Sequence, residues 1–256
     1  MVADPAATGD KVEVVHLVTA RHVVEAARAT GKPLHVRGTS ESGGIAITPP
    51  LDFNAWHVSD VTDIAIFKNA PLDGFAGSCL CFDKFANQEY LNSNRIGPGD
   101  EVFFAGLFTS HAGSAHNEPI LRFGNISMMP REPVEIQNAD GSRTSVSAFL
   151  VEARSWGGQS GSPAFVWLSP LRNPGVITMP EIDGPNKPLP LNAQPHLLGL
   201  VCGHFDISRD ITFKGDSNIS GTVGINAGVA IVIPAADIAT EFETSLCRNV
   251  NQLLPG

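Results

Sequence analysis

The chain has 256 residues, of which 43% are hydrophobic and 17% charged, and its formal net charge at pH 7 is -9. Such a composition is typical of a folded globular protein rather than a disordered one, and the length allows one large domain or two small ones. The acidic balance, the absence of a Lys/Arg cluster and the shortness of every apolar run argue against nucleic acid and membranes as partners.

Short β-rich runs recur along the chain between clusters of Gly, Pro, Asn and Asp, whereas helical periodicity is scarce. This pattern predicts an all-β fold built as a barrel or sandwich. Helices are expected only over Val23–Ala29 and over Ala235–Cys247, where apolar residues recur at every fourth position. The predicted strands are Leu34–Arg37, Ile45–Thr48, Asp63–Phe67, Glu101–Leu107, Ile120–Ser127, Ser145–Val151, Pro163–Leu168, His196–Cys202 and Gly228–Ile233.

Turn-forming residues separate these strands. Asp140-Gly141 is predicted to close a hairpin. The seven prolines between Ser169 and Pro195 predict a long surface loop, and a second loop is expected over Asp206–Thr222. Gly97-Pro98-Gly99 interrupts the pattern, which divides the chain into an N-terminal domain of residues 1–97 and a C-terminal domain of residues 98–256.

The first residues, Met1–Asp10, have no positively charged start followed by an apolar core. No secretory signal peptide is therefore expected, which favours a cytoplasmic location. The four cysteines, Cys79, Cys81, Cys202 and Cys247, are too few and too scattered for a disulfide framework and lack the spacing of a zinc site. We expect them to be buried free thiols, and we expect no metal ion and no cofactor.

The segment most informative about chemistry is Gly157-Gly158-Gln159-Ser160-Gly161-Ser162-Pro163, which directly precedes an apolar strand. Glycines that flank a serine allow a tight turn in which main-chain N–H groups point at one spot beside the hydroxyl. Here the N–H groups of Gly158 and Ser160 would form such an oxyanion hole. A Gly/Ser-rich turn entering a strand explains the segment equally well.

Two further polar residues stand at the ends of apolar segments. His22 follows the apolar run Leu17-Val18 and precedes a short helical pattern, and Asp63 heads the run Ile64-Ala65-Ile66. Each alone is more typical of a packed residue than of a catalytic one. Asp60 competes with Asp63 for the same role, but it lacks the apolar run directly behind it.

Together, these residues supply a nucleophile, a base and a carboxylate. A serine hydroxyl is a weak nucleophile until a base takes its proton, and that base needs a carboxylate to fix its tautomer. The chain order is His22, Asp63, Ser160, the order of the chymotrypsin-type enzymes rather than that of subtilisin or the α/β-hydrolases.

The sequence resembles the trypsin-like serine proteases, and in particular their bacterial single-chain branch. Thr19-Ala20-Arg21-His22 is similar to the family's histidine motif, Asp63-Ile64-Ala65-Ile66 to its aspartate motif, and Gly158-Gln159-Ser160-Gly161-Ser162-Pro163 to its serine motif. Leu198-Gly199-Leu200-Val201-Cys202-Gly203 is similar to the strand that pairs with bound substrate, and Gly228–Pro234 to the last barrel strand before a terminal helix.

This resemblance implies two six-stranded antiparallel β-barrels with a short C-terminal helix. It also implies a serine endopeptidase that cleaves a polypeptide substrate with His22, Asp63 and Ser160. Cys202, Gly203 and His204 would then lie along the substrate, and Arg154 would lie near the base of the primary pocket. A positive charge on Arg154 or His204 would favour an acidic side chain just before the scissile bond. Alternatively, Arg154 points outward into solvent.

The sequence also departs from the family. Gln159 replaces the aspartate that precedes the serine in the pancreatic enzymes, so activation by cleavage is not expected. The short segment before His22 predicts an open first barrel that is less stable and tends to self-associate. Two other functions stay open: a protein of the same fold that binds peptides without cutting them, and a hydrolase of small esters.

Overall fold

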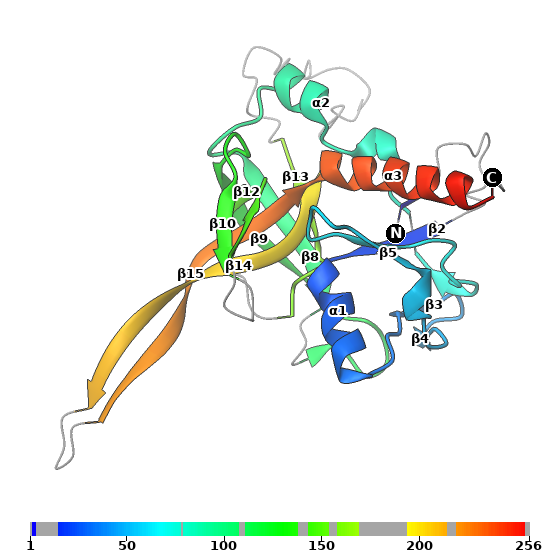
Figure 1. Ribbon diagram of the computed structural model, residues 1–256, viewed down its shortest axis with the longest axis horizontal. Helices are drawn as coiled ribbons and strands as arrows, with labels where there is room; N and C mark the ends of the chain where they lie inside the picture. The colour runs from blue at the N-terminus through cyan, green and yellow to red at the C-terminus, as the bar shows by residue number, and fades with distance from the viewer. Residues whose placement is uncertain are drawn as a thin grey trace, which may run out of the picture.

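The computed structural model describes residues 2–3, 15–77, 79–107, 111–137, 143–153, 158–168, 194–213 and 219–253, and strands dominate these residues. The expectation of a mainly β fold with a short C-terminal helix is confirmed (Figure 1). The described α-helices are α1 (Arg21–Thr30), α2 (Gln88–Ser93) and α3 (Ala235–Leu253), with 3-10 turns at Phe53–Ala55 and Phe82–Lys84. These helices lack the combination of length and apolar character that crossing a bilayer requires.

Six strands of the second half close into a barrel in the order β12-β15-β14-β13-β8-β9. All neighbours are antiparallel, and β9 pairs with β12 to complete the cylinder. In β8 the buried Val102 and Phe104 alternate with more exposed neighbours, the period of two expected of a strand with one buried face. The barrel strands are β8 (Glu101–Leu107), β9 (Pro119–Met128), β12 (Phe149–Glu152), β13 (Pro163–Val166), β14 (His196–Phe213) and β15 (Ile219–Pro234).

The strands of the first half form two separate sheets. One has four strands in the order β1-β2-β6-β5, the other three in the order β4-β3-β7. Among the described residues these strands do not close into a second barrel, so only one of the two predicted barrels is observed. The strands are β1 (Val2–Ala3), β2 (Val15–Thr19), β3 (Arg37–Ser40), β4 (Ile45–Ile47), β5 (Trp56–Val58), β6 (Ala65–Phe67) and β7 (Phe75–Ala76).

The loop predicted over Asp206–Thr222 is wrong. β14 continues to Phe213 and β15 begins at Ile219, and the two strands pair from Gly199↔Pro234 to Phe213↔Ile219. They form a two-stranded arm that projects from the barrel (Figure 1). In the run Asp206–Phe213, apolar residues occupy every second position except Arg209, which favours a strand, whereas the two aspartates and the serine favour a loop.

Several boundaries also differ from those predicted. The run Ser145–Val151 is divided into β11 (Arg143–Val146) and β12. At Ser147 and Ala148 the chain passes from the two-stranded sheet of β11 to the barrel of β12. β11 pairs with β10 (Val134–Gln137), so the predicted hairpin is observed, although Asp140-Gly141 itself lies outside the described residues. The strand expected over Leu34–Arg37 begins only at Arg37, and α2 was not predicted.

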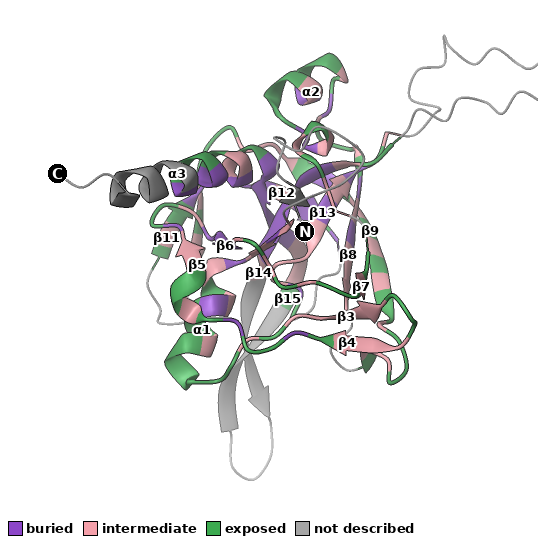
Figure 2. Cartoon of the chain, turned by 90° about the vertical axis from the view of Figure 1, so that its right-hand side faces the viewer, coloured by how far each residue is buried: buried purple, intermediate pink, exposed green. Residues whose placement is uncertain are grey.

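The two halves share a hydrophobic core. Ile64 and Ile66 from the first half pack in one buried cluster with Leu200 and Ile233 of the barrel and with Phe242 of α3. Figure 2 shows buried segments on both β6 and α3. The C-terminal helix therefore helps to bury the sheet whose strand β2 precedes the candidate histidine and whose strand β6 follows the candidate aspartate.

Candidate functional site

The first part of the candidate site is the junction of β2 with α1. β2 pairs with β6 in antiparallel register, with Thr19 opposite Ala65. Two residues beyond that pair on each strand, the main-chain N–H of Arg21 donates to the carbonyl oxygen of Asp63 at 3.2 Å. This register brings Asp63 to the first turn of α1, where His22 is the second residue.

Asp63 binds His22 through both carboxylate oxygens. Oδ1 accepts from the main-chain N–H of His22 at 2.9 Å, and Oδ2 lies 2.7 Å from ring Nδ1. The N-cap residue Ala20 has no side-chain hydrogen bond, so Asp63 supplies from another segment the acceptor that a helix N-terminus requires. A carboxylate at this position is also favoured by the helix dipole.

The two side chains differ strongly in exposure. The Asp63 side chain is 9% exposed, whereas that of His22 is 48% exposed. A hydrogen bond from Nδ1–H to a carboxylate fixes the neutral imidazole in the tautomer that leaves Nε2 free to accept a proton. Asp60, the competing carboxylate, lies exposed on the same loop, whereas the buried Asp63 contacts the ring directly. The geometry therefore favours Asp63 as the partner of His22.

Ser160 lies at the corner of a tight turn. The N–H of Ser162 donates to the carbonyl oxygen of Gln159 at 3.0 Å, which closes a four-residue turn with Ser160 second and Gly161 third. Gly161 has φ +88°, as a type II turn requires at that position. The turn is attached to β14 because the N–H of Gly161 donates to the carbonyl oxygen of Val201 at 2.8 Å.

The serine turn lies against the strand that leads into His22. A Cβ atom added at Gly161 would collide with Thr19 Oγ1 and would stand 3.5 Å from the main-chain nitrogen of Ala20. The serine turn therefore contacts the chain at Thr19 and Ala20, and Ala20 is two residues before His22 in the sequence. Among the described residues, no hydrogen bond joins the Ser160 hydroxyl to the His22 ring. Such bonds are often formed only in the substrate complex.

The predicted oxyanion hole consists of two main-chain N–H groups. Gly158 is exposed and has φ +92°, and Ser160 is partly buried. No described residue accepts a hydrogen bond from the N–H of Gly158 or of Ser160. Gln159 between them is buried, and within the described part of the chain its Oε1 has no hydrogen-bond donor. The role of these two amides stays a prediction.

Cys202, Gly203 and His204 lie on β14 beyond its last pair with β13, which is Leu200↔Pro163. On the other side, Gly203 and His204 pair with Ile231 and Ala230 of β15. Among the described strands, only β15 therefore flanks this part of β14. Its second edge faces the side on which the serine turn is attached at Val201. A strand edge of this kind can pair with an extended peptide.

The Cys202 thiol lies near the buried carboxylate of Asp63. Burial raises the pKa of Cys202, and the negative charge of Asp63 raises it further. Of the other predicted buried thiols, Cys79 is partly buried and Cys81 is exposed, so that expectation is wrong for Cys81. The side chain of Cys247 and the whole of Arg154 lie outside the described residues.

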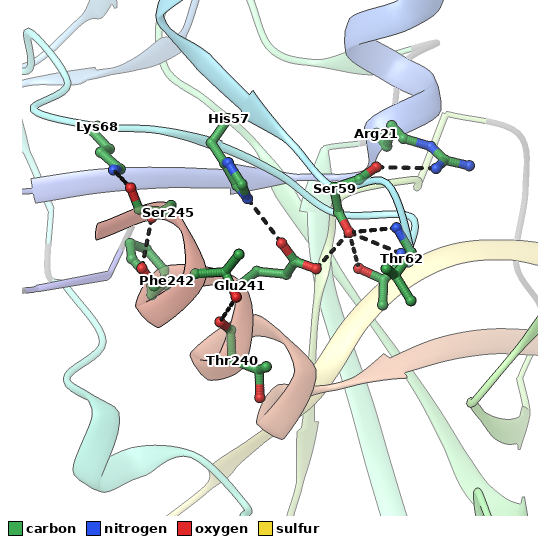
Figure 3. A network of polar contacts seen from close by, with 11 residues as sticks. Arg21, His57, Ser59, Thr62, Lys68, Thr240, Glu241, Phe242 and Ser245 are labelled. Carbon is green, nitrogen blue, oxygen red and sulfur yellow. Dashed lines mark hydrogen bonds and ion pairs between the residues drawn. The ribbon is translucent and has the colours of Figure 1, made fainter. Parts of the chain in front are cut away.

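Sequence reasoning missed a polar network beside the site, although one of its members, Arg21, stands in the histidine motif. Arg21, Ser59 and Glu241 form a polar network under the loop that ends at Asp63 (Figure 3). Glu241 belongs to the C-terminal helix, 182 residues away from Ser59. No local pattern relates positions so distant in sequence, so only the fold reveals the contact.

Comparison with known proteins does not assign a family to the chain. Scanned against models of known protein families, the sequence matches none. A search of curated proteins finds no significant match. Within the described residues, no group of three or more His, Cys, Asp or Glu side chains is arranged to hold a metal ion. A function for this chain therefore rests on its motifs and on the contacts of His22, Asp63 and Ser160.

Proposed function

We propose that this chain is a serine endopeptidase that uses Ser160 as nucleophile, His22 as general base and Asp63 as the residue that orients the base. The observation that carries the proposal is the double contact of Asp63 with His22, 2.9 Å to its main-chain nitrogen and 2.7 Å to Nδ1. A buried carboxylate that accepts from both groups fixes the ring while leaving its other nitrogen accessible. The packing of Gly161 against Thr19 supports the proximity of Ser160.

The proposed chemistry needs only these side chains. His22 Nε2 removes the hydroxyl proton as Ser160 Oγ adds to the carbonyl carbon of the scissile peptide bond. The protonated ring then gives that proton to the amine nitrogen, so the C–N bond breaks and an ester of Ser160 remains. Water, deprotonated by the same nitrogen, adds to the ester carbonyl. The bond to Ser160 Oγ then breaks, Nε2 returns the proton to that oxygen, and the carboxylic acid leaves. Asp63 stabilises the imidazolium in both halves of the reaction.

The proposed peptide substrate would bind along β14. Its extended main chain would pair with the edge of Cys202–His204, and the N–H groups of Gly158 and Ser160 would stabilise the negative oxygen of the tetrahedral intermediate. The two sheets of the first half would serve as the counterpart of the first barrel of a trypsin-like fold. In that arrangement the reacting groups lie where the two halves meet.

A fluorophosphonate probe tests this proposal directly, because it forms a covalent bond only with an activated serine. The native protein should be labelled at Ser160, and Ser160→Ala should abolish labelling and turnover, the latter by on the order of 10⁶-fold. Ser162→Ala, two residues further on, is the matched control and should keep the label. A native protein that binds peptides but does not react with the probe would support a pure binding module instead.

Peptide and ester substrates then distinguish the two kinds of hydrolase. An endopeptidase should cleave internal peptide bonds of an unfolded protein, and its fragments identify the residue preceding the cleaved bond. Hydrolysis of small esters without any cleavage of peptides would support an esterase. In both cases EDTA should leave the rate unchanged, because no step of the proposed reaction requires a metal ion.

A further inference from the structure

We infer that Glu241 of the C-terminal helix and Ser59 are positioning residues that set the conformation of the loop carrying Asp63, and hence the orientation of His22. This inference rests on the proposed function for its effect on catalysis. It adds two residues that lie outside the three sequence motifs and that touch no reacting atom. Figure 3 shows the network to which they belong.

The loop to be held is the connection between β5 and β6. β5 pairs with β6 from Trp56↔Phe67 to Val58↔Ala65, and the N–H of Ser59 donates to the carbonyl oxygen of Ile64 at 3.0 Å. The hairpin loop is therefore residues 60–63, and Asp63 is its last residue. The position of the Asp63 carboxylate depends on how this loop folds.

The loop folds around the hydroxyl of Ser59. Ser59 Oγ accepts from the main-chain N–H groups of Val61 at 3.1 Å and Thr62 at 2.9 Å, and it lies 3.1 Å from Thr62 Oγ1. A serine hydroxyl has two lone pairs and one proton. With its lone pairs directed at the loop, its proton needs an acceptor on the opposite side.

Glu241 is that acceptor. Ser59 Oγ donates to Glu241 Oε1 at 2.5 Å, and the other carboxylate oxygen, Oε2, lies 2.9 Å from His57 Nε2. Ser59 is 2% exposed and Glu241 9% exposed, so water does not readily replace either contact. Hydrogen bonds to an ionised acceptor are about twice as strong as those between neutral groups.

A second contact links the same serine to the histidine side of the site. The carbonyl oxygen of Ser59 accepts from the Arg21 guanidinium at 3.1 Å, and Arg21 directly precedes His22. The main-chain N–H of Arg21 in turn donates to the carbonyl oxygen of Asp63. Ser59 thus contacts both the segment that precedes His22 and the loop that ends at Asp63. Glu241 holds Ser59 in place from α3.

The helix itself is firmly placed, so it can serve as a support. Ile238 and Phe242 of α3 lie in the core shared by the two halves, and Lys68 Nζ donates to the carbonyl oxygen of Ser245 at 2.7 Å. Lys68 follows β6 directly, so the helix is bound to the β5–β6 hairpin at its strand end as well as at its loop. Removing Glu241 should therefore release the loop without detaching the helix.

The experiment measures His22 itself as well as activity. Ring ¹⁵N chemical shifts, assigned with a His22→Gln variant, report which ring nitrogen carries the proton. In the native protein we expect the Nδ1–H tautomer that Asp63 stabilises. In Glu241→Ala and Ser59→Ala we expect this tautomer to lose its dominance, and labelling of Ser160 by the fluorophosphonate to slow by on the order of 10²-fold.

Two further variants make the result specific. Glu241→Gln should keep most of the native tautomer and labelling rate, because its amide oxygen still accepts from Ser59. Glu243→Ala, exposed on the same helix, should change neither measurement. Circular dichroism checks that each variant folds. If Glu241→Ala does not fold, Ser59→Ala, which removes a single oxygen atom, still tests whether the network sets the His22 tautomer.

A native His22 tautomer in folded Ser59→Ala or Glu241→Ala would overturn the inference. Failure of the proposed function gives a different result. If the native protein never reacts with the fluorophosphonate while the His22 signals still respond to Ser59→Ala, the positioning network exists but the chain is not a serine hydrolase.

Discussion

Gly161 lies so close to Thr19 that a single added carbon at Gly161 would collide with the threonine hydroxyl oxygen. This contact joins the serine turn of the barrel half to β2, which ends three residues before His22. The Gly161 main chain approaches the Thr19 side chain, and glycine is favoured here for a second reason, because Gly161 has φ +88°. The serine turn can thus approach Thr19 this closely only because Gly161 has no side chain.

Gly161→Ala should therefore impair both folding and the site. The unfavourable φ costs about 1–3 kcal/mol of unfolding free energy, and the methyl group must also displace Thr19 or the serine turn. Gly31→Ala is the matched control, since Gly31 has φ +66° but nothing within 4 Å of the added carbon. Denaturant unfolding should show a loss in both variants, and slower fluorophosphonate labelling only in Gly161→Ala. Equal labelling rates would contradict the proximity of Thr19 and Ser160.

Asp63→Asn should lower turnover by about 10⁴-fold if Asp63 has the proposed role. Asp63 accepts from two N–H groups of His22. An amide can accept at only one of its two positions, so its NH₂ group would face one of these donors or force the ring into the other tautomer. Asp60→Asn, on the exposed side of the same loop, is the control and should change turnover little. A similar loss in both variants would mean that the loop as a whole, rather than the carboxylate of Asp63, is responsible.

The strands of the second half could be predicted from the sequence better than those of the first half. The barrel strands were predicted well where one face is buried, as in Glu101–Leu107, because alternating burial leaves a period of two in the sequence. In the first half the strands have only two to five residues, so that little periodicity is available. Arg37–Ser40 was misplaced for this reason.

The candidate site was predictable only where a motif or a known reaction chemistry names the residue types. The pairing of Asp63 with His22 followed from known chemistry, and the β2–β6 register provides it. The contacts of Ser59 with Glu241 and of Gly161 with Thr19 depend on how separate elements pack. Such contacts leave no signal in a single sequence, because any compatible residue types would satisfy local preferences equally well.

Asp237→Asn should stabilise the protein at neutral pH. Burial raises the pKa of Asp237 in the folded state, and the charge of Glu241 raises it further. A carboxyl group with a raised folded-state pKa is protonated more readily when folded, so its ionisation weakens folding as the pH rises above the unfolded-state value of about 3.9. Urea unfolding should show a more stable variant at pH 7 and no difference at pH 3.

Glu243→Gln controls for the change in net charge, because Glu243 is exposed on the same helix. It should leave the unfolding free energy nearly unchanged at both pH values. An equal gain from both substitutions would indicate a general effect of the formal charge of -9 rather than the local environment of Asp237.

The cysteines should react with iodoacetamide at very different rates. Cys81 is exposed, whereas Cys202 is 6% exposed, and burial together with the nearby charge of Asp63 raises the pKa of its thiol. Only the thiolate attacks the reagent. Peptide mass spectrometry should find Cys81 alkylated in the native protein and Cys202 alkylated only after unfolding. Rapid modification of native Cys202 would contradict its burial beside Asp63.

The contact between Ser59 and Glu241 has a consequence for the order of events during synthesis. Its two residues are 182 positions apart, and the ribosome adds about 5–20 residues each second. Ser59 and Asp63 therefore leave the ribosome about 9–36 s before the residue that holds their loop, and His22 leaves earlier still. If Glu241 positions Asp63, Ser160 also emerges before the base is correctly oriented. A nascent chain would then attack its neighbours about 10²-fold more slowly, and full activity would be reached only when α3 docks.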